Sequence, residues 1–131
     1  MKTESGRRLR VLVVDDDPVI RRALRLILRS EPGVTVVGEA ADGEDAVIQA
    51  DQLRPDVVLM DLRMPRMDGL EATRRLKARN PDVMVVILSV YADGFDAARA
   101  AGASYLLLKD SPVETLLEAL HSAPPVKGID Q

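Results

Sequence analysis

Side chains that could do chemistry follow four short apolar runs of this sequence. They are Asp15, Asp16, Asp17, Asp61, Ser89 and Lys109. Adjacent carboxylates repel one another unless a cation lies between them, and Mg2+ prefers oxygen ligands of this kind. The hydroxyl and the ammonium group could bind other oxygens of the same anion. Together these groups suit the transfer of a phosphoryl group, with one carboxylate as the nucleophile.

Each of these side chains also has a purely structural interpretation. Adjacent aspartates after a strand commonly cap a turn, and Asp61 alone could do the same. A serine such as Ser89 at a strand end commonly bonds to the backbone, and a lysine such as Lys109 is commonly a solvated surface charge. The functional interpretation is favoured because all of these residues occupy the same kind of position, the end of an apolar run.

The apolar runs predict five buried β-strands. Each run is continuous rather than alternating in apolar character, as expected for a strand that is covered on both faces. The expected strands span residues 10–14, 34–38, 57–60, 83–88 and 105–108. Apolar residues with helical spacing occupy residues 19–28, 46–53, 70–76, 95–101 and 113–120.

This alternation predicts an α/β fold, in which an open sheet of five parallel strands carries helices on both faces. Ligands of such sheets bind at the carboxyl ends of the strands, where the strand order reverses. Because the carboxyl ends of parallel strands lie at one edge, we expect Asp15, Asp61, Ser89 and Lys109 to lie close together.

Composition excludes several classes of function. A chain of 131 residues suits one domain, and its net charge of −3 offers no broad basic face for nucleic acid. Without cysteine there is no disulfide framework and no thiol chemistry. The apolar runs are too short for a signal peptide or a membrane span, so we expect a cytoplasmic protein with no membrane partner.

Four motifs resemble those of the receiver domains of two-component response regulators. They are VLVVDDDP, VVLMDLRMPRMDG, VVILS and GASYLLLKD, and the resemblance extends from about Arg10 to Ala119. It implies a flavodoxin-like, doubly wound (βα)5 fold. It also implies a signalling domain rather than an enzyme, one that catalyses only its own phosphorylation and dephosphorylation.

The resemblance assigns a role to each candidate residue. By it, Asp61 is the phosphoacceptor, and Asp15 and Asp16 are the acidic pair that holds Mg2+ together with Asp61. The main-chain carbonyl of Arg63 is a further metal ligand by the same resemblance. Ser89 and Lys109 correspond to the family's hydroxyl and lysine, which bind the oxygens of the phosphoryl group.

Asp17 lies outside this acidic pair. Its position before Pro18 predicts the N-cap of the first helix, because proline suits the first helical turn. Similarly, Asp68 and Gly69 mark a turn into the third helix.

The predicted signalling face departs from the family pattern. Receivers usually carry an aromatic residue three positions before the lysine, where this chain has Leu106, and Tyr105 stands one place earlier. We expect the switch to involve Ser89 with Leu106, or with Tyr105 if a local bulge brings it to that position. The stretch from Ser89 to Gly102 is shorter than usual, which predicts that either the fourth helix or the loop leading to it is trimmed.

The expected organisation is an N-terminal tail (1–8), a receiver domain (9–122) and a linker or C-terminal tail (123–131). The resemblance implies a sensor histidine kinase as partner. The sequence Lys109-Asp110 is similar to receivers that precede a helix-turn-helix DNA-binding domain, so we expect control of transcription through an output domain absent from this chain. A stand-alone receiver that acts by protein contact is the alternative. Homodimerisation is left open by the sequence.

Two rival functions have less support from the sequence. A haloacid-dehalogenase-like phosphatase would use Asp15 as its nucleophile and Asp17 as its second acid. It would leave Asp61 unexplained, and it needs a later acidic pair that this chain lacks. A flavin-binding protein of the same fold would need aromatic residues for stacking, and the chain has no Trp, one Phe and two Tyr.

Overall fold

The computed structural model describes residues 8–122, so the predicted tails lie largely outside the described residues. A sheet of five parallel strands forms the centre of the molecule, in the order β2-β1-β3-β4-β5. The chain reverses its direction of travel across the sheet at β1, which lies between β2 and β3. The strands are β1 (Leu9–Val14), β2 (Val34–Ala40), β3 (Val57–Met60), β4 (Met84–Ser89) and β5 (Tyr105–Leu108).

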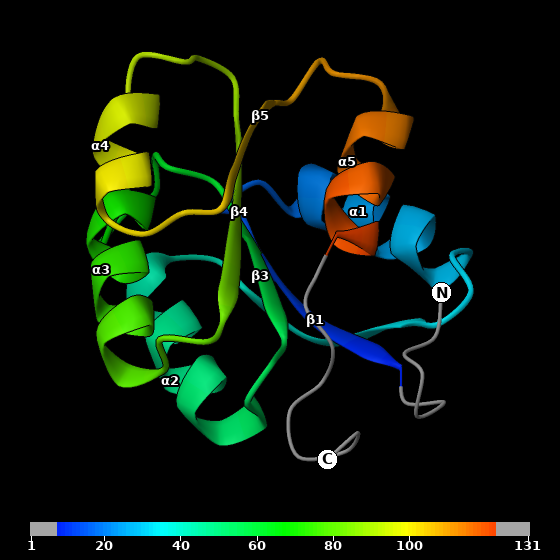
Figure 1. Cartoon of the computed structure of the whole chain (residues 1–131), viewed down its shortest axis with the longest axis horizontal. Coiled ribbons are helices and arrows are strands. Elements are labelled where there is room, and N and C mark those ends of the chain that lie inside the picture. The colour runs from blue at the N-terminus through cyan, green and yellow to red at the C-terminus, as the bar shows by residue number, and fades with distance from the viewer. Residues whose placement is uncertain (1–7, 123–131) are drawn as a thin grey trace.

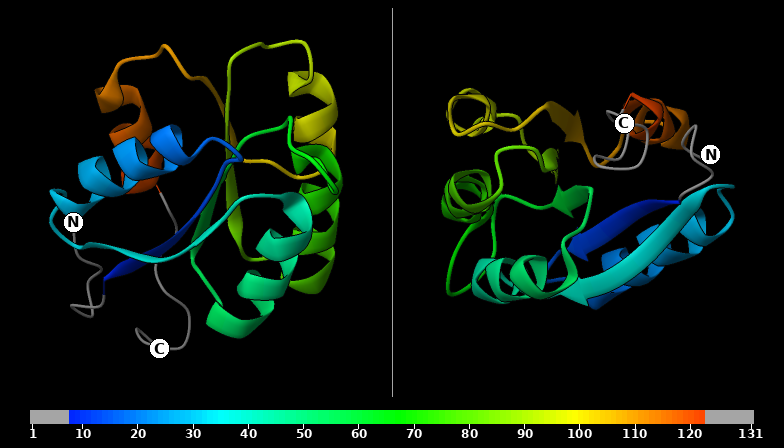
Figure 2. Two further views of the ribbon diagram at one scale, coloured as in Figure 1. Left: turned by 180° about the vertical axis from the view of Figure 1, so that it is seen from behind. Right: turned by 60° about the horizontal axis from the view of Figure 1, so that its bottom comes forward.

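Five helices cover the two faces of this sheet (Figures 1 and 2). Helices α2, α3 and α4 lie on one face, and α1 and α5 lie on the other. Their bounds are α1 (Pro18–Arg29), α2 (Gly43–Leu53), α3 (Gly69–Arg79), α4 (Phe95–Ala100) and α5 (Val113–His121). The predicted flavodoxin-like α/β fold is therefore confirmed. No helix within residues 8–122 is long and apolar enough to cross a membrane.

The continuous apolar strands form a core on each face of the sheet. In β1, Leu12 and Val14 pack toward α2 and α3, whereas Val11 and Val13 pack toward α1 and α5. All four side chains are almost fully buried. Successive side chains of a strand point to opposite faces, so a strand covered on both sides must be apolar at every position.

Strand β2 is longer than its sequence pattern predicts. The sequence indicates an end at Gly38, but pairing with β1 continues to Ala40 through a register shift that skips Val37. Glu39 extends the strand although it is polar, because its partly buried carboxylate forms ion pairs with Arg21 and Arg25. The other strand boundaries agree with the predictions to within one residue.

Aspartates begin three of the helices. Asp17, Asp42 and Asp68 each accept a hydrogen bond from a main-chain N–H of the first turn of α1, α2 and α3, respectively. The cap at Asp17 confirms the prediction, and Asp68, predicted to mark a turn into the third helix, also caps that helix. Such side chains satisfy N–H groups that have no partner within the helix.

The region expected to signal is regular in β5 and short in α4. Strand β5 pairs with β4 without a bulge, from Tyr105 opposite Val86 to Leu108 opposite Ser89. Leu106 packs into the core beside α4, and Tyr105 packs into the core on the opposite face. Helix α4 has only six residues, so of the two predicted alternatives it is the helix that is short, and it begins without a side-chain cap.

Candidate functional site

The carboxyl ends of the strands bring the predicted residues together. Asp15 follows β1, Asp61 follows β3, Ser89 ends β4 and Lys109 follows β5. Main-chain bonds hold these ends in place, since the Asp61 N–H donates to the Val14 carbonyl (3.1 Å) and the Lys109 N–H donates to the Ser89 carbonyl (2.8 Å). The site thus rests on the rigid ladder of the sheet rather than on free loops.

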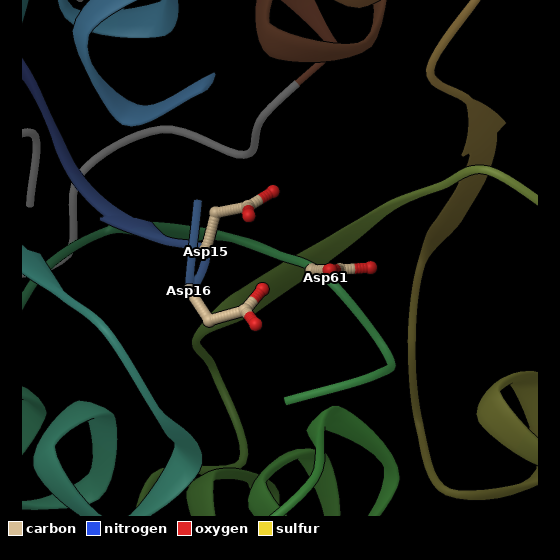
Figure 3. A group of neighbouring side chains, drawn as sticks. All are labelled: Asp15, Asp16 and Asp61. Carbon is tan, nitrogen blue, oxygen red and sulfur yellow. The ribbon is translucent and has the colours of Figure 1, made fainter. Parts of the chain in front are cut away.

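Three carboxylates form an acidic cluster at this edge (Figure 3). Oxygens of Asp15, Asp16 and Asp61 lie within 4.8 Å of one another. Asp15 and Asp61 are buried, at 2% and 7% exposure, whereas Asp16 is exposed. A hard divalent cation such as Mg2+ fits this donor set, because all donors are carboxylate oxygens and the exposed side leaves room for water and for an anionic oxygen.

Lys109 reaches into this cluster from the fifth strand. Its Nζ lies 2.7 Å from Asp15 Oδ2 and 3.3 Å from Asp61 Oδ2. Burial disfavours the ammonium form, but the hydrogen bond and the charge of Asp15, with a further contribution from Asp61, outweigh it and raise the pKa of Lys109. The lysine therefore stays charged and offsets part of the repulsion among the carboxylates.

The Asp61 carboxyl group has a raised pKa. Burial is the main cause; the attraction of Lys109 opposes it, and the negative charge of Asp15 adds to it. Lys109 compensates Asp61 only partly because its ammonium group lies closer to Asp15. A cation between the carboxylates would lower the pKa of Asp61.

Arg63 lies two positions beyond Asp61, and its side chain turns toward the loop between β4 and α4. Its Nη2 donates to Asp93 Oδ2 at 2.6 Å, and its guanidinium carbon lies 5.4 Å from the centre of the Tyr91 ring. These contacts involve only the side chain of Arg63. The predicted metal ligand is its main-chain carbonyl, which they do not occupy.

Asp17 stays outside the cluster as predicted. Its Oδ1 accepts a hydrogen bond from the Val19 N–H at 2.9 Å, while its own N–H donates to Asp15 Oδ1 at the same distance. One carboxylate thus begins the helix and the other faces the site. This division gives Asp17 no place as a second acid beside Asp15.

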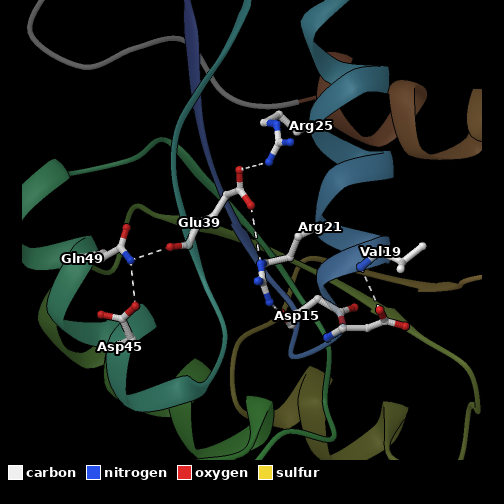
Figure 4. Close-up of polar contacts among 8 residues, drawn as sticks. Asp15, Val19, Arg21, Arg25, Glu39, Asp45 and Gln49 are labelled. Atoms are coloured by element: carbon white, nitrogen blue, oxygen red, sulfur yellow. Dashed lines mark hydrogen bonds and ion pairs between the residues drawn. The ribbon is translucent and has the colours of Figure 1, made fainter.

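Arg21 is a neighbour of the site whose role the sequence did not reveal. Its Nη1 donates to the Asp15 carbonyl at 2.7 Å (Figure 4). Its Nε lies 3.5 Å from Glu39 Oε1, and Glu39 also pairs with Arg25. These contacts link the loop after β1 to α1 and β2. The only signal in the sequence is a basic residue in the second turn after the carboxylates.

Comparisons with known proteins agree with this geometry. Residues 11–121 match the model of the response regulator receiver domain. The chain is 40% identical over 115 residues to the nitrate/nitrite response regulator protein NarL of Escherichia coli, covering 86% of this chain and 53% of that protein. It is 50% identical over 93 residues to protein-glutamate methylesterase/protein-glutamine glutaminase 4 of Myxococcus xanthus, covering 71% of this chain and 26% of that protein.

A solved structure shows the same fold. The response regulator domain of Thermotoga maritima CheB superposes with a TM-score of 0.84 at 34% identity, covering 89% of this chain and 96% of that chain. The chain spans about half the length of the nitrate/nitrite response regulator that it matches and about a quarter of the methylesterase. From its match to the family model over residues 11–121, the chain belongs to the response regulator receiver domains of two-component systems.

Proposed function

We propose that Asp61 accepts a phosphoryl group from the phosphohistidine of a sensor histidine kinase. A carboxylate oxygen of Asp61 attacks the phosphorus, the phosphorus–nitrogen bond of the donor breaks, and its electron pair stays with the leaving imidazole, which takes up a proton. Asp15, Asp16, Asp61 and the Arg63 carbonyl would hold Mg2+, which neutralises charge on the transferring group. Lys109 pairs with a further phosphoryl oxygen.

The position of the Asp61 carboxylate carries this proposal. It lies at the end of the central strand β3, is almost fully buried, and has two carboxylates and one ammonium group around it. Burial makes its charge costly without a cation. A site of this kind favours binding of a metal and a phosphoryl group, which together supply charge compensation and oxygen ligands.

The same residues support a switch in the phosphorylated state. Phosphorylation replaces the single negative charge of the Asp61 carboxylate by the charge of about −1.5 to −2 of a phosphoryl group, with its additional oxygens. Ser89 would then hydrogen-bond to the new oxygens and draw the following loop with it. Ser89 and Ile87 lie on the same face of β4, because the side chains of a strand alternate. Leu106 packs on that face and Tyr105 packs on the other, so Leu106 is better placed to fill the space that the movement of Ser89 vacates. Hydrolysis of the acyl phosphate resets the switch.

The proposed output is transcription, through a DNA-binding domain distinct from the receiver. Similarity to the transcriptional regulatory protein DegU of Brevibacillus brevis, at 39% identity over 49% of that protein, supports this proposal, and a net charge of −3 makes the receiver itself a poor ligand for DNA. The methylesterase relative shows that other proteins place a similar domain beside an enzyme. We place the protein in the cytoplasm, with the kinase as its partner.

Mass spectrometry of the intact protein tests the proposal. The parent, Asp61→Asn and Asp96→Asn are incubated with acetyl phosphate, with and without Mg2+. Asp96 is the matched control because its carboxylate is fully exposed on α4, away from the cluster. We expect a single adduct of about 80 Da on the parent and on Asp96→Asn, only with Mg2+, and none on Asp61→Asn.

Two results would contradict the assignment. An acid-labile phosphoryl group on Asp61→Asn would show that another residue is the nucleophile. A parent that binds Mg2+ but gains no adduct would show that the site is silent toward phosphoryl transfer and that the protein is controlled in another way.

A further inference from the structure

The loop between β3 and α3 contains a residue in an unusual conformation. Arg66 has a φ of +66°, in the left-handed region. A side chain with a Cβ is disfavoured there, so contacts around the residue must hold it. Arg54 is the other non-glycine residue with positive φ within residues 8–122, and it ends helix α2, where this conformation is common. Arg66 ends no helix.

The guanidinium group of Arg66 binds a buried carboxylate. Its Nε and Nη2 both donate to Asp42 Oδ2, at 2.9 and 2.6 Å. Asp42 is only 5% exposed, and its other oxygen accepts from the Asp45 N–H at 2.8 Å to cap α2. Asp42 thus connects the start of α2 to the loop that follows Asp61.

Main-chain contacts connect the same two segments. The Gly43 N–H donates to the Met67 carbonyl at 2.8 Å, and a Cβ on Gly43 would lie 2.2 Å from that oxygen. The loop is closed at its base because the Gly69 N–H donates to the Leu62 carbonyl at 2.8 Å. Arg63 therefore lies between the closed base of the loop and the segment fixed to α2.

We propose that Arg66 is a positioning residue, whose ion pair with Asp42 fixes the loop so that Asp61 and the Arg63 carbonyl are preorganised to hold Mg2+. This inference rests on the proposed function. An ion pair that only joined α2 to α3 would affect stability alone. A pair that preorganises the loop also raises the affinity for the cation, because the cost of ordering the ligands is then met on folding rather than at binding.

Replacing Arg66 by glycine separates these two roles. Glycine adopts a positive φ without penalty, so Arg66→Gly removes the guanidinium group without adding backbone strain. Arg79→Ala is the matched control. Arg79 on α3 binds Asp51 on α2 through Nε at 2.6 Å and through Nη2, so its loss breaks an ion pair that joins α2 to α3 at a distance from the site.

Calorimetric titration with Mg2+ and amide hydrogen exchange of the metal-free proteins supply the readouts. We expect Arg66→Gly to bind Mg2+ about tenfold more weakly than the parent, the lower end of the effect of supporting residues at metal sites. We also expect faster exchange at residues 63–67. Arg79→Ala should match the parent in both measurements.

A second variant tests whether the two partners act as a unit. Asp42→Asn keeps an oxygen that caps α2 but loses the charge that binds Arg66. We expect it to weaken Mg2+ binding as Arg66→Gly does, and we expect the double variant to be no weaker than either single variant. Additive losses would show that the two residues act independently and would overturn the proposal.

The remaining outcomes separate the two proposals. If the parent binds Mg2+ and gains the phosphoryl adduct while Arg66→Gly binds Mg2+ equally tightly, the positioning role is wrong and the proposed function stands. If the parent binds no Mg2+, both proposals are wrong. An equal loss of affinity in Arg79→Ala would show that general loosening of α2 and α3 is the cause, against a specific role of Arg66.

Discussion

At the residue scale, the charge of Lys109 is shared unequally between two carboxylates. Lys109 lies closer to Asp15 than to Asp61, at 2.7 and 3.3 Å, so the buried Asp61 carboxylate is only partly compensated. Burial, together with this partial compensation, accounts for the raised pKa of Asp61. The proposed nucleophile is therefore a source of instability in the metal-free protein, as is common for residues retained for function.

A stability measurement at two pH values checks this conclusion. At about pH 7 we expect Asp61→Asn to raise the free energy of unfolding of the metal-free protein by about 1 kcal/mol, because it removes a buried charge. The folded-state pKa of Asp61 lies above its ordinary value of 3.8, so the parent regains this stability as the pH falls and Asp61 takes up a proton. Urea denaturation at neutral pH and at about pH 4.5 measures the change.

The expected result is a gain that shrinks at the lower pH. Saturating Mg2+ should reverse the order of the two proteins, because only the parent keeps the full set of carboxylates and binding to the folded state stabilises it. A variant that is less stable than the parent at neutral pH without metal would contradict the assigned balance.

At the scale of elements, the junction of β1 with α1 divides two tasks between neighbouring carboxylates. Asp15 faces the site, and Asp17 caps the helix. Arg21, in the next turn of α1, holds the Asp15 carbonyl. Asp16, which lies between them, belongs to the acidic cluster with Asp15. Each of the three adjacent aspartates therefore has its own role, two in the site and one at the start of the helix.

Substitution of Asp17 tests this division. We expect Asp17→Ala to lower the free energy of unfolding by about 1 kcal/mol, whereas Asp17→Asn, which keeps a capping oxygen, changes it much less. Both variants should bind Mg2+ and gain the phosphoryl adduct as the parent does. Loss of the adduct in Asp17→Asn would bring Asp17 into the reaction and would favour a phosphatase-like site with Asp15 as nucleophile.

At the scale of the whole molecule, one sheet separates two apolar cores. Leu28 of α1 lies in the core between the sheet and α1 with α5, and Leu76 of α3 lies in the core on the other face. Both are buried, with 0% and 3% exposure. Both cores pack against the same sheet, so we expect the described part of the chain to unfold as one cooperative unit.

A pair of truncations examines this cooperation. Leu28→Ala and Leu76→Ala should each lower the free energy of unfolding by about 2 to 4 kcal/mol through loss of burial and creation of a cavity. The sheet lies between the two sites, so the losses should add in the double variant to within about 0.5 kcal/mol. Denaturation followed by circular dichroism measures them. Two separate transitions would contradict a single unit.

The sequence by itself determined the sheet, the helices and the candidates for the site. Short, β-branched apolar runs that alternate with helical patterns are typical of strands covered on both faces. Carboxylates that follow such strands meet at one edge of a parallel sheet. Caps such as Asp17 and Asp68 are local signals, because the side chain bonds to main-chain groups within three residues.

Only the tertiary structure decided which charged groups pair across the sheet. The closer approach of Lys109 to Asp15 than to Asp61 depends on how β5 is placed beside β4 and on how β3 separates them from β1. The pair of Arg66 with Asp42 joins residues 24 positions apart, and neither residue has a local pattern that reveals the other. Pairs between residues so far apart in the sequence depend on where whole elements lie in the fold. The residues that support the site were therefore harder to predict than those that form it.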